Sequence, residues 1–428
     1  MKDRGQDLCD YIWDSPSPYH CVDSSTARLR AAGFIELKEQ DVWSALPPGA
    51  AHYIIRDGTL VAWRMGTDSI PVAGFRLLGA HTDSPNLRLK PHADYVREGY
   101  TQWGVEPYGG ILAYTWFDRD LGLSGRVVLR GSNGPVLRNV RIDRPLARIA
   151  SLAIHLNRGI RTDGFKPNAQ QHFPPMLGMF HDDAPDLLPR LISDALDVDP
   201  RDFIGGDLML HDLQVPVVGG VNGDFVFAPR LDNQASCYTA IEALIAQQQP
   251  VAPTIGAVLF DHEEVGSRSS SGAAGQLLVR ILNRIIAAAE AQSPGGLARA
   301  SAQSFTVSAD MAHGVHPNYA DRHDGNHKPM LNGGVVIKSN VNQRYSTNAE
   351  TAARVELAAE AAEVPVQKFI NRSDLACGTT IGPLAAAELG VRSVDIGAAM
   401  LSMHSIREQT GTADIEAMIK VKAELLRS

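Results

Sequence analysis

After Arg230 the chain alternates short apolar runs with longer segments of helical length, and this alternation constrains the fold more than any other feature. Runs such as 255–260 and 305–309 fit buried strands, whereas 234–247 and 349–362 fit helices. Strands that alternate with helices are typical of a three-layer α/β/α domain with a mostly parallel sheet. The sequence therefore predicts an α/β fold whose ligands bind at the carboxyl ends of the strands.

The middle of the chain has a different character. Between about residues 92 and 222 it is richer in Gly-Gly, in proline and in short β-type runs such as 125–130 and 213–218. We therefore predict a single α/β domain built from residues 1–91 and 223–428, interrupted by a β-rich insertion of residues 92–222. Further helices are predicted at 275–291, 381–389 and 415–425, and further strands at 366–370 and 393–396.

Two adjacent glutamates, Glu263 and Glu264, follow the predicted strand 255–260 almost directly. In an extended backbone neighbouring side chains point to opposite sides, so one carboxylate can hold a metal while the other handles the proton of a water. A solvated acidic loop is the simpler interpretation of such a pair taken alone. The other strand ends must decide between these two interpretations.

Four other segments also place metal-type side chains where a strand ends or a helix begins. His81 follows the strand-like run 74–79, and Asp83 beside it can accept a hydrogen bond from the ring's other N–H or orient the site. Asp310 directly follows the run 305–309. Asp232 opens a predicted helix, where it can equally be an N-cap, and His404 precedes the last helix, where it can equally be a packed loop residue.

With Glu264, these segments supply two histidines and three carboxylates at successive strand ends. Such a set suits two divalent metals roughly 3.5–4 Å apart that share one carboxylate. Zinc accepts this mixture of nitrogen and oxygen ligands, and manganese or cobalt can substitute for it. Glu263 is then left to take a proton from the attacking water and to deliver it to the leaving amine.

Composition limits the partners and the compartment. The formal net charge of −8 argues against nucleic acid or an anionic membrane as the main partner. No stretch approaches the roughly 18–20 apolar residues of a membrane helix. The N-terminal residues are polar, and the four cysteines form no Cys-x-x-Cys pair, so we predict a cytoplasmic protein with reduced thiols.

Four segments together resemble the motifs of the aspartyl aminopeptidase family, whose members are zinc exopeptidases with two metals per site. They are Gly-Ala-His-Thr-Asp-Ser-Pro at 79–85, Glu-Glu-Val-Gly-Ser at 263–267, residues 310–319 and Met-His-Ser-Ile-Arg-Glu at 403–408. The resemblance runs from end to end in the order and spacing of the motifs. It implies an enzyme that removes N-terminal Asp or Glu from peptides.

The resemblance also implies roles for individual residues. His81, Asp232 and Asp310 would hold one zinc ion, and Asp232, Glu264 and His404 the other, with Asp232 as the bridge. Glu263 matches the general base. The insertion resembles a dimerisation domain, and the family assembles as a tetrahedral dodecamer built from dimers.

The implied substrate pocket includes Lys338, which would pair with the acidic side chain, together with His313 and Tyr345. His155 matches a histidine that reaches the active site of a neighbouring subunit. It would bind substrate or steady the oxyanion there; a role as metal ligand and a plain buried histidine remain alternatives.

Two other functions remain open. An aminopeptidase for neutral residues or a deacylase of N-acyl amino acids can use a similar two-metal site. An inactive, metal-stabilised scaffold belongs to a different class, and Glu263 argues against it because a purely structural site needs no base.

Overall fold

The computed structural model describes residues 3–180, 186–290 and 293–428. It divides into two compact units, each with its own core. The first unit comprises Met1–Asp83, Pro216–Met403 and Glu408–Ser428, and the second comprises Ser84–Val215 and His404–Arg407. The chain thus leaves the first unit several residues before the predicted position 91. The reason is that strand β5 (Asn86–Arg97) runs unbroken across that position as part of the second unit's sheet.

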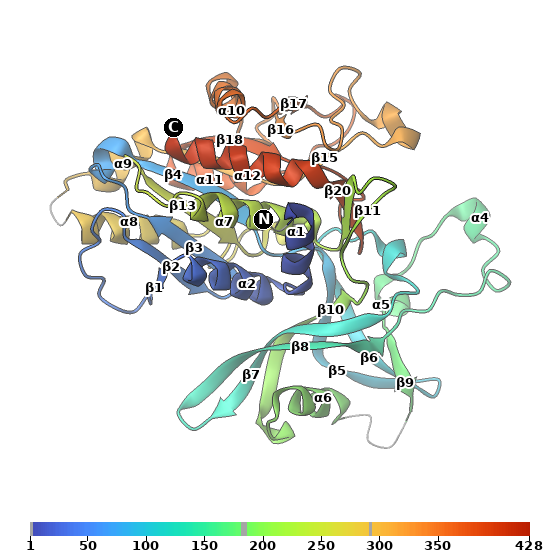
Figure 1. Ribbon diagram of the computed structural model, residues 1–428. Helices are drawn as coiled ribbons and strands as arrows, with labels where there is room; N and C mark the ends of the chain where they lie inside the picture. The colour runs from blue at the N-terminus through green and yellow to red at the C-terminus, as the bar shows by residue number, and fades with distance from the viewer. Residues whose placement is uncertain (1–2, 181–185, 291–292) are drawn as a thin grey trace. The chain divides into compact units, whose positions relative to one another are not determined.

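A mixed sheet forms the centre of the first unit (Figure 1). Among the described residues it has nine strands, in the order β1-β2-β3-β13-β4-β14-β18-β16-β17. Their bounds are β1 Ile35–Glu36, β2 Ala51–Arg56, β3 Thr59–Arg64, β13 Thr254–Phe260, β4 Phe75–His81, β14 Phe305–Ala309, β18 Arg392–Gly397, β16 Val335–Lys338 and β17 Val366–Phe369. The four central strands, β13, β4, β14 and β18, are mutually parallel, so their carboxyl ends meet at one edge.

Helices cover both faces of this sheet. Side chains alternate along β13: Ala257 and Leu259 join one core, and Val258 and Phe260 the other. The first core also takes side chains from α1 (Arg4–Trp13), α2 (Pro18–Ala31), α7 (Leu231–Ile245), α10 (Ala349–Ala361) and α12 (Thr412–Arg427). The second takes them from α3 (Ile70–Ala73), α8 (Leu277–Ala289), α9 (Gly296–Gln303) and α11 (Ile381–Leu389). The predicted three-layer α/β/α fold is confirmed.

The predicted helices agree with the structure to within a few residues, and α8 shows the apolar stripe on which such a prediction rests. In α8, Leu277, Leu278, Ile281, Leu282 and Ile285 are buried at the helical spacing, whereas the charged positions between them are not. Residue 291, the predicted end of that helix, lies outside the described residues.

A smaller sheet of the first unit continues from the ends of β14 and β18. It has the order β11-β12-β20-β19-β15, with bounds Val217–Gly219, Phe225–Ala228, Glu408–Gly411, Ala399–Leu401 and Ala312–His313. Short 3-10 turns follow two strands of this unit, η4 at Glu263–Val265 and η5 at Pro317–Arg322.

The second unit is built on an antiparallel sheet. Its described strands run in the order β8-β7-β10-β5-β6-β9. Their bounds are Gly134–Ala147, Leu121–Gly131, Phe203–Asp212, Asn86–Arg97, Tyr100–Tyr108 and Met176–Met179. Helix α6 (Leu187–Leu196) packs into the core of this sheet, and η1 (Ala113–Trp116), α4 (Ile160–Asp163), α5 (Ala169–His172) and η3 (Pro200–Asp202) lie in its connections. Over the described part of the chain, no helix has both the length and the apolarity needed to cross a bilayer.

Candidate metal centre

His81 is the last residue of β4, and its buried ring organises the candidate site. Nδ1 lies 3.0 Å from the backbone oxygen of Asp83, which can only accept, so Nδ1 carries the proton and Nε2 is left as a ligand. Nε2 faces three carboxylates. It lies 3.5 Å from Oδ1 of Asp232, 3.9 Å from Oε2 of Glu263 and 3.9 Å from Oδ2 of Asp310. Carboxylates from three separate segments therefore converge on one nitrogen.

Asp83 ties the end of β4 to the glutamate pair. Its carboxylate is fully buried and accepts the backbone N–H groups of Glu263 and Glu264, each at 3.1 Å. One carboxylate oxygen also lies 3.4 Å from Nδ1 of His81. Asp83 thus fixes the backbone of the pair and the orientation of the ring at the same time.

The extended backbone expected at the glutamate pair is not present. Glu263 and Glu264 lie in the 3-10 turn η4, between His262 at φ 64° and Gly266 at φ 95°. The turn forms because the N–H of Gly266 bonds to the oxygen of Glu263, and the two buried N–H groups find their acceptor in Asp83. The two side chains diverge because residues of a 3-10 turn are about 120° apart, and not because a pleated strand alternates.

Asp232 lies at the start of α7, where the backbone departs from helical geometry and the Asp232–Asn233 peptide bond is cis. It is not the N-cap, a position that Arg230 occupies. Its N–H donates to the buried Oε2 of Glu408 at 3.0 Å, while its carboxylate faces His81. Asn233 donates to the oxygen of Ala309 at 2.8 Å, which joins this kink to the end of β14.

Two supporting residues were not anticipated from the sequence. Glu408 holds the backbone of Asp232, and Cys237 donates its thiol to the backbone oxygen of His81 at 2.9 Å. The position of Glu408 at the end of the motif 403–408 was the available signal. Cys237 offered none, because a lone buried cysteine is usually a packing residue.

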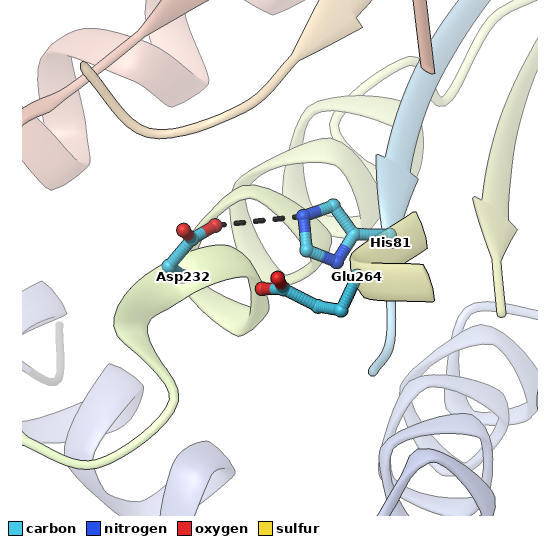
Figure 2. A group of neighbouring side chains, drawn as sticks. All are labelled: His81, Asp232 and Glu264. Atoms are coloured by element: carbon cyan, nitrogen blue, oxygen red, sulfur yellow. Dashed lines mark ion pairs between the residues drawn. The ribbon is translucent and has the colours of Figure 1, made fainter. Parts of the chain in front are cut away.

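His81, Asp232 and Glu264 have the geometry of a metal site. One ligand atom from each lies within 4.8 Å of the other two, and Figure 2 shows the Asp232 carboxylate facing the His81 ring with Glu264 beside them. Ligand atoms about 2.0–2.1 Å from a tetrahedral zinc ion lie about 3.4 Å apart. The 3.5 Å between Nε2 of His81 and Oδ1 of Asp232 already matches this spacing, and the nitrogen and oxygen donors are those that zinc accepts. The residues fit the metal.

Asp310 also lies beside a buried lysine, Lys338. Its Oδ1 lies 3.5 Å from Nζ of Lys338, which ends β16 and is 2% exposed. Nζ also donates to the oxygen of Met311 at 3.2 Å, and it lies 5.1 Å from the ring centroid of Tyr345, which is itself buried. Lys338 therefore contacts both the Asp310 carboxylate and the Tyr345 ring.

The electrostatics of this cluster favour a cation. The pKa of Glu263 is raised to about 8, chiefly by burial, and the carboxylates of Asp310 and Asp83 add to the shift. Burial also raises the pKa of Asp310. Burial alone would lower the pKa of His81, but attraction to Glu263 and hydrogen bonds to neighbouring carboxylates raise it well above its usual value. Without a metal the cluster therefore retains protons, which a divalent cation can replace.

Three further predicted site residues take no part in the contacts described so far. His404 belongs to the second unit, where its Nδ1 lies 2.9 Å from the oxygen of Gly110. His155 lies on an exposed segment of the same unit. His313 ends β15 in the first unit, with its exposed ring 5.7 Å from that of Phe369. Their proposed roles stay predictions.

Comparisons with known proteins identify the family. Residues 11–424 match the family model described as aminopeptidase I zinc metalloprotease (M18). A probable M18 family aminopeptidase 2 of Pseudomonas entomophila (strain L48) is 44% identical over 427 residues, which cover 98% of this chain and 97% of that protein.

Solved structures agree with this assignment. The structure of an Ape4 and Nbr1 complex contains a chain that is 37% identical, with a TM-score of 0.95, covering 100% of this chain and 86% of that one. The mApe1 dodecamer of S. cerevisiae is 30% identical, with a TM-score of 0.86, covering 99% and 96% of the two chains. The resemblance seen in the sequence motifs is confirmed. The chain belongs to the M18 family of zinc aminopeptidases.

Proposed function

We propose that the chain is a dinuclear zinc aminopeptidase that removes N-terminal Asp or Glu from peptides. The observation that supports this best is the convergence of Asp232, Glu263 and Asp310 within 3.9 Å of Nε2 of His81. A structural zinc site needs four ligands and no spare carboxylate, whereas a hydrolase also needs a base. The excess of carboxylates fits the hydrolase.

In this proposal His81, Asp232 and Asp310 hold one zinc ion, and Asp232, Glu264 and His404 hold the other. Asp232 suits the bridge because its carboxylate faces His81 and belongs to the same close group as Glu264. When bound, zinc supplies a Lewis acid that polarises the peptide carbonyl and acidifies a water; manganese or cobalt can supply the same chemistry.

The chain's own residues then move the proton. Divalent cations beside Glu263 oppose the effects that raise its pKa to about 8, so the carboxylate is ionised at neutral pH and can accept a proton. Glu263 takes this proton from the attacking water and returns it to the departing amine. Asp83 is a positioning residue, since it holds the backbone of Glu263 and Glu264 and the ring of His81.

The substrate side of the proposal rests on fewer contacts. Lys338 adds positive charge next to Asp310 and faces the ring of Tyr345, and the ring of His313 lies against that of Phe369. These three residues are proposed to line the substrate pocket. His155 is proposed to act at a neighbouring subunit or, alternatively, as a metal ligand. The second unit, residues 84–215 with 404–407, is proposed as the dimerisation domain of a tetrahedral dodecamer in the cytoplasm. The dodecameric structure of mApe1 from S. cerevisiae supports that assembly.

Hydrolysis of Asp-, Glu-, Ala- and Leu-p-nitroanilides by the zinc-loaded protein tests the function. We expect kcat/KM to be highest for Asp and Glu. A preference for Ala or Leu would instead indicate a neutral aminopeptidase, and activity only on N-acyl amino acids a deacylase. Fewer than two zinc ions per chain, with no hydrolysis after zinc is added, would indicate a scaffold.

A further inference from the structure

Residues 261–271 form a loop that carries the glutamate pair, and one side chain outside the loop joins its two ends. Thr59, the first residue of β3, is fully buried. Its Oγ1 accepts the N–H of Asp261 at 2.9 Å and donates to the backbone oxygen of Ser271 at 2.7 Å. The loop therefore starts and ends on a single fixed group of the central sheet.

The backbone bends sharply on both sides of the pair. His262 has φ 64° and Ser267 has φ 60°, in the left-handed region that residues with a side chain rarely adopt. The N–H of Ser267 donates to the backbone oxygen of His262 at 2.8 Å, which closes the turn around Glu263 and Glu264. A backbone of this shape persists only where surrounding contacts hold it in place.

The side chain of His262 makes such a contact across the loop. Its Nδ1 lies 2.9 Å from Oγ of Ser269, and a hydroxyl can donate or accept, so the hydrogen bond forms whichever atom carries the proton. Oγ of Ser269 also accepts the N–H of Gly272 at 3.0 Å. Gly272 itself is tightly packed, because a Cβ there would lie 2.2 Å from the backbone oxygen of Ser267. The partner of His262 is therefore well fixed.

Asp83 and His262 hold different parts of the same turn. Asp83 accepts the N–H groups of Glu263 and Glu264, whereas the His262 side chain fixes the residue at which the chain enters the turn. The direction of the backbone at residue 262 decides where the side chain of residue 263 points. A change there would move the Glu263 carboxylate from its position 3.9 Å from Nε2 of His81.

We propose that the hydrogen bond between His262 and Ser269 positions the carboxylate of Glu263 for proton transfer. The proposal rests on the role of Glu263 as general base in the proposed function. His262 and Ser269 are positioning residues, since they act through the backbone of the turn. Glu264 is less dependent on them, because a bound zinc ion would hold its carboxylate directly, whereas Glu263 makes no bond to metal.

The test measures kcat, KM and zinc content with Asp-p-nitroanilide in zinc-loaded His262→Phe and Ser269→Ala. The first variant keeps an aromatic ring but removes both ring nitrogens, and the second removes the hydroxyl. Each should lower kcat about 3- to 30-fold, between the loss of one neutral hydrogen bond and the misplacement of a catalytic group. KM and zinc content should stay within about twofold of the wild type, because neither residue binds substrate or metal.

Two comparisons separate positioning from general damage. His262→Asn keeps a polar atom at the δ position, and asparagine tolerates a left-handed backbone, so kcat should return to within about twofold of the wild type. The double variant of His262→Phe and Ser269→Ala should lower kcat no further than the more severe single variant, since both remove one interaction. Ser270→Ala, at the exposed neighbour of Ser269, is the matched control and should leave kcat unchanged.

Hydrogen–deuterium exchange supplies a readout besides activity. In the metal-free protein, the amides of Ser267 and Gly272 should exchange faster in His262→Phe and Ser269→Ala than in the wild type, and at the wild-type rate in His262→Asn. These two amides donate the hydrogen bonds that close the turn and support Ser269.

An unchanged kcat in both single variants, unchanged exchange of both amides, or additive losses in the double variant would overturn the positioning role and leave the proposed function standing. The same holds if zinc content falls while turnover per bound zinc does not, because that result indicates a purely structural contact. A zinc-loaded wild type that hydrolyses none of the p-nitroanilides would overturn the proposed function, and this role with it.

Discussion

Replacing Asp83 by Asn tests whether this buried carboxylate positions the metal centre. The wild-type carboxylate accepts two backbone N–H groups at 3.1 Å and lies 3.4 Å from Nδ1 of His81. An asparagine has one acceptor oxygen, so its NH₂ group must face a second donor, and the negative charge is lost. Loss of one charge-assisted hydrogen bond costs about 1.5–3 kcal/mol, or roughly 10- to 150-fold in an equilibrium constant.

We therefore expect Asp83→Asn to weaken zinc binding about 10- to 100-fold and to lower kcat by a similar factor, the range usual for groups that support metal ligands. Competition with a chromophoric chelator gives the zinc affinity, and kcat is measured at saturating zinc. Asp68→Asn, an exposed aspartate of the same unit, should change neither. Zinc affinity and kcat of Asp83→Asn both within twofold of the wild type would refute the positioning role.

Two further predictions follow from the pKa shifts. Without metal, the pKa of Glu263 is about 8 and that of His81 is raised, so the cluster holds protons at pH 7. Zinc binding should therefore release protons and become stronger as pH rises. Calorimetry in buffers of different ionisation enthalpy tests this, and a binding heat that is the same in all buffers would contradict it. Burial lowers the pKa of Lys422 to about 7, and its ammonium bonds Thr239 at 2.7 Å. Between pH 7 and about 10 the unfolded chain binds more protons at this lysine than the folded chain does, so Lys422 should contribute a rise in stability of about 1 kcal/mol per pH unit. Lys422→Met should flatten the rise of Tm over this range, and an identical pH profile in both proteins would contradict the assignment.

The fold could be predicted because each strand and helix has a recognisable pattern of apolar residues within its own segment of the sequence. The strands are short apolar runs because both faces of the sheet are buried, and a helix that packs on one face, such as α8, carries an apolar stripe on one side. His81, Asp310 and the glutamate pair follow strand ends, and parallel strands bring those ends together. The convergence of these residues could therefore be inferred from spacing alone.

Other features depend on contacts between distant segments, which spacing does not encode. The turn at Glu263 and Glu264 requires Asp83 as acceptor, 180 residues away in sequence. The support that Glu408 gives to Asp232 spans 176 residues. The burial of Lys338 beside Asp310 and Tyr345 likewise follows from tertiary packing.

The most direct test of the central claim is a parallel measurement of zinc content and turnover in Glu263→Gln. Glutamine keeps the shape of the side chain but cannot accept the proton of the water. We predict two zinc ions per chain, as in the wild type, with kcat reduced about 10²- to 10⁴-fold, the usual contribution of a general base. Turnover near that of the wild type, with zinc retained, would contradict the assignment of Glu263 as the base and the mechanism built on it.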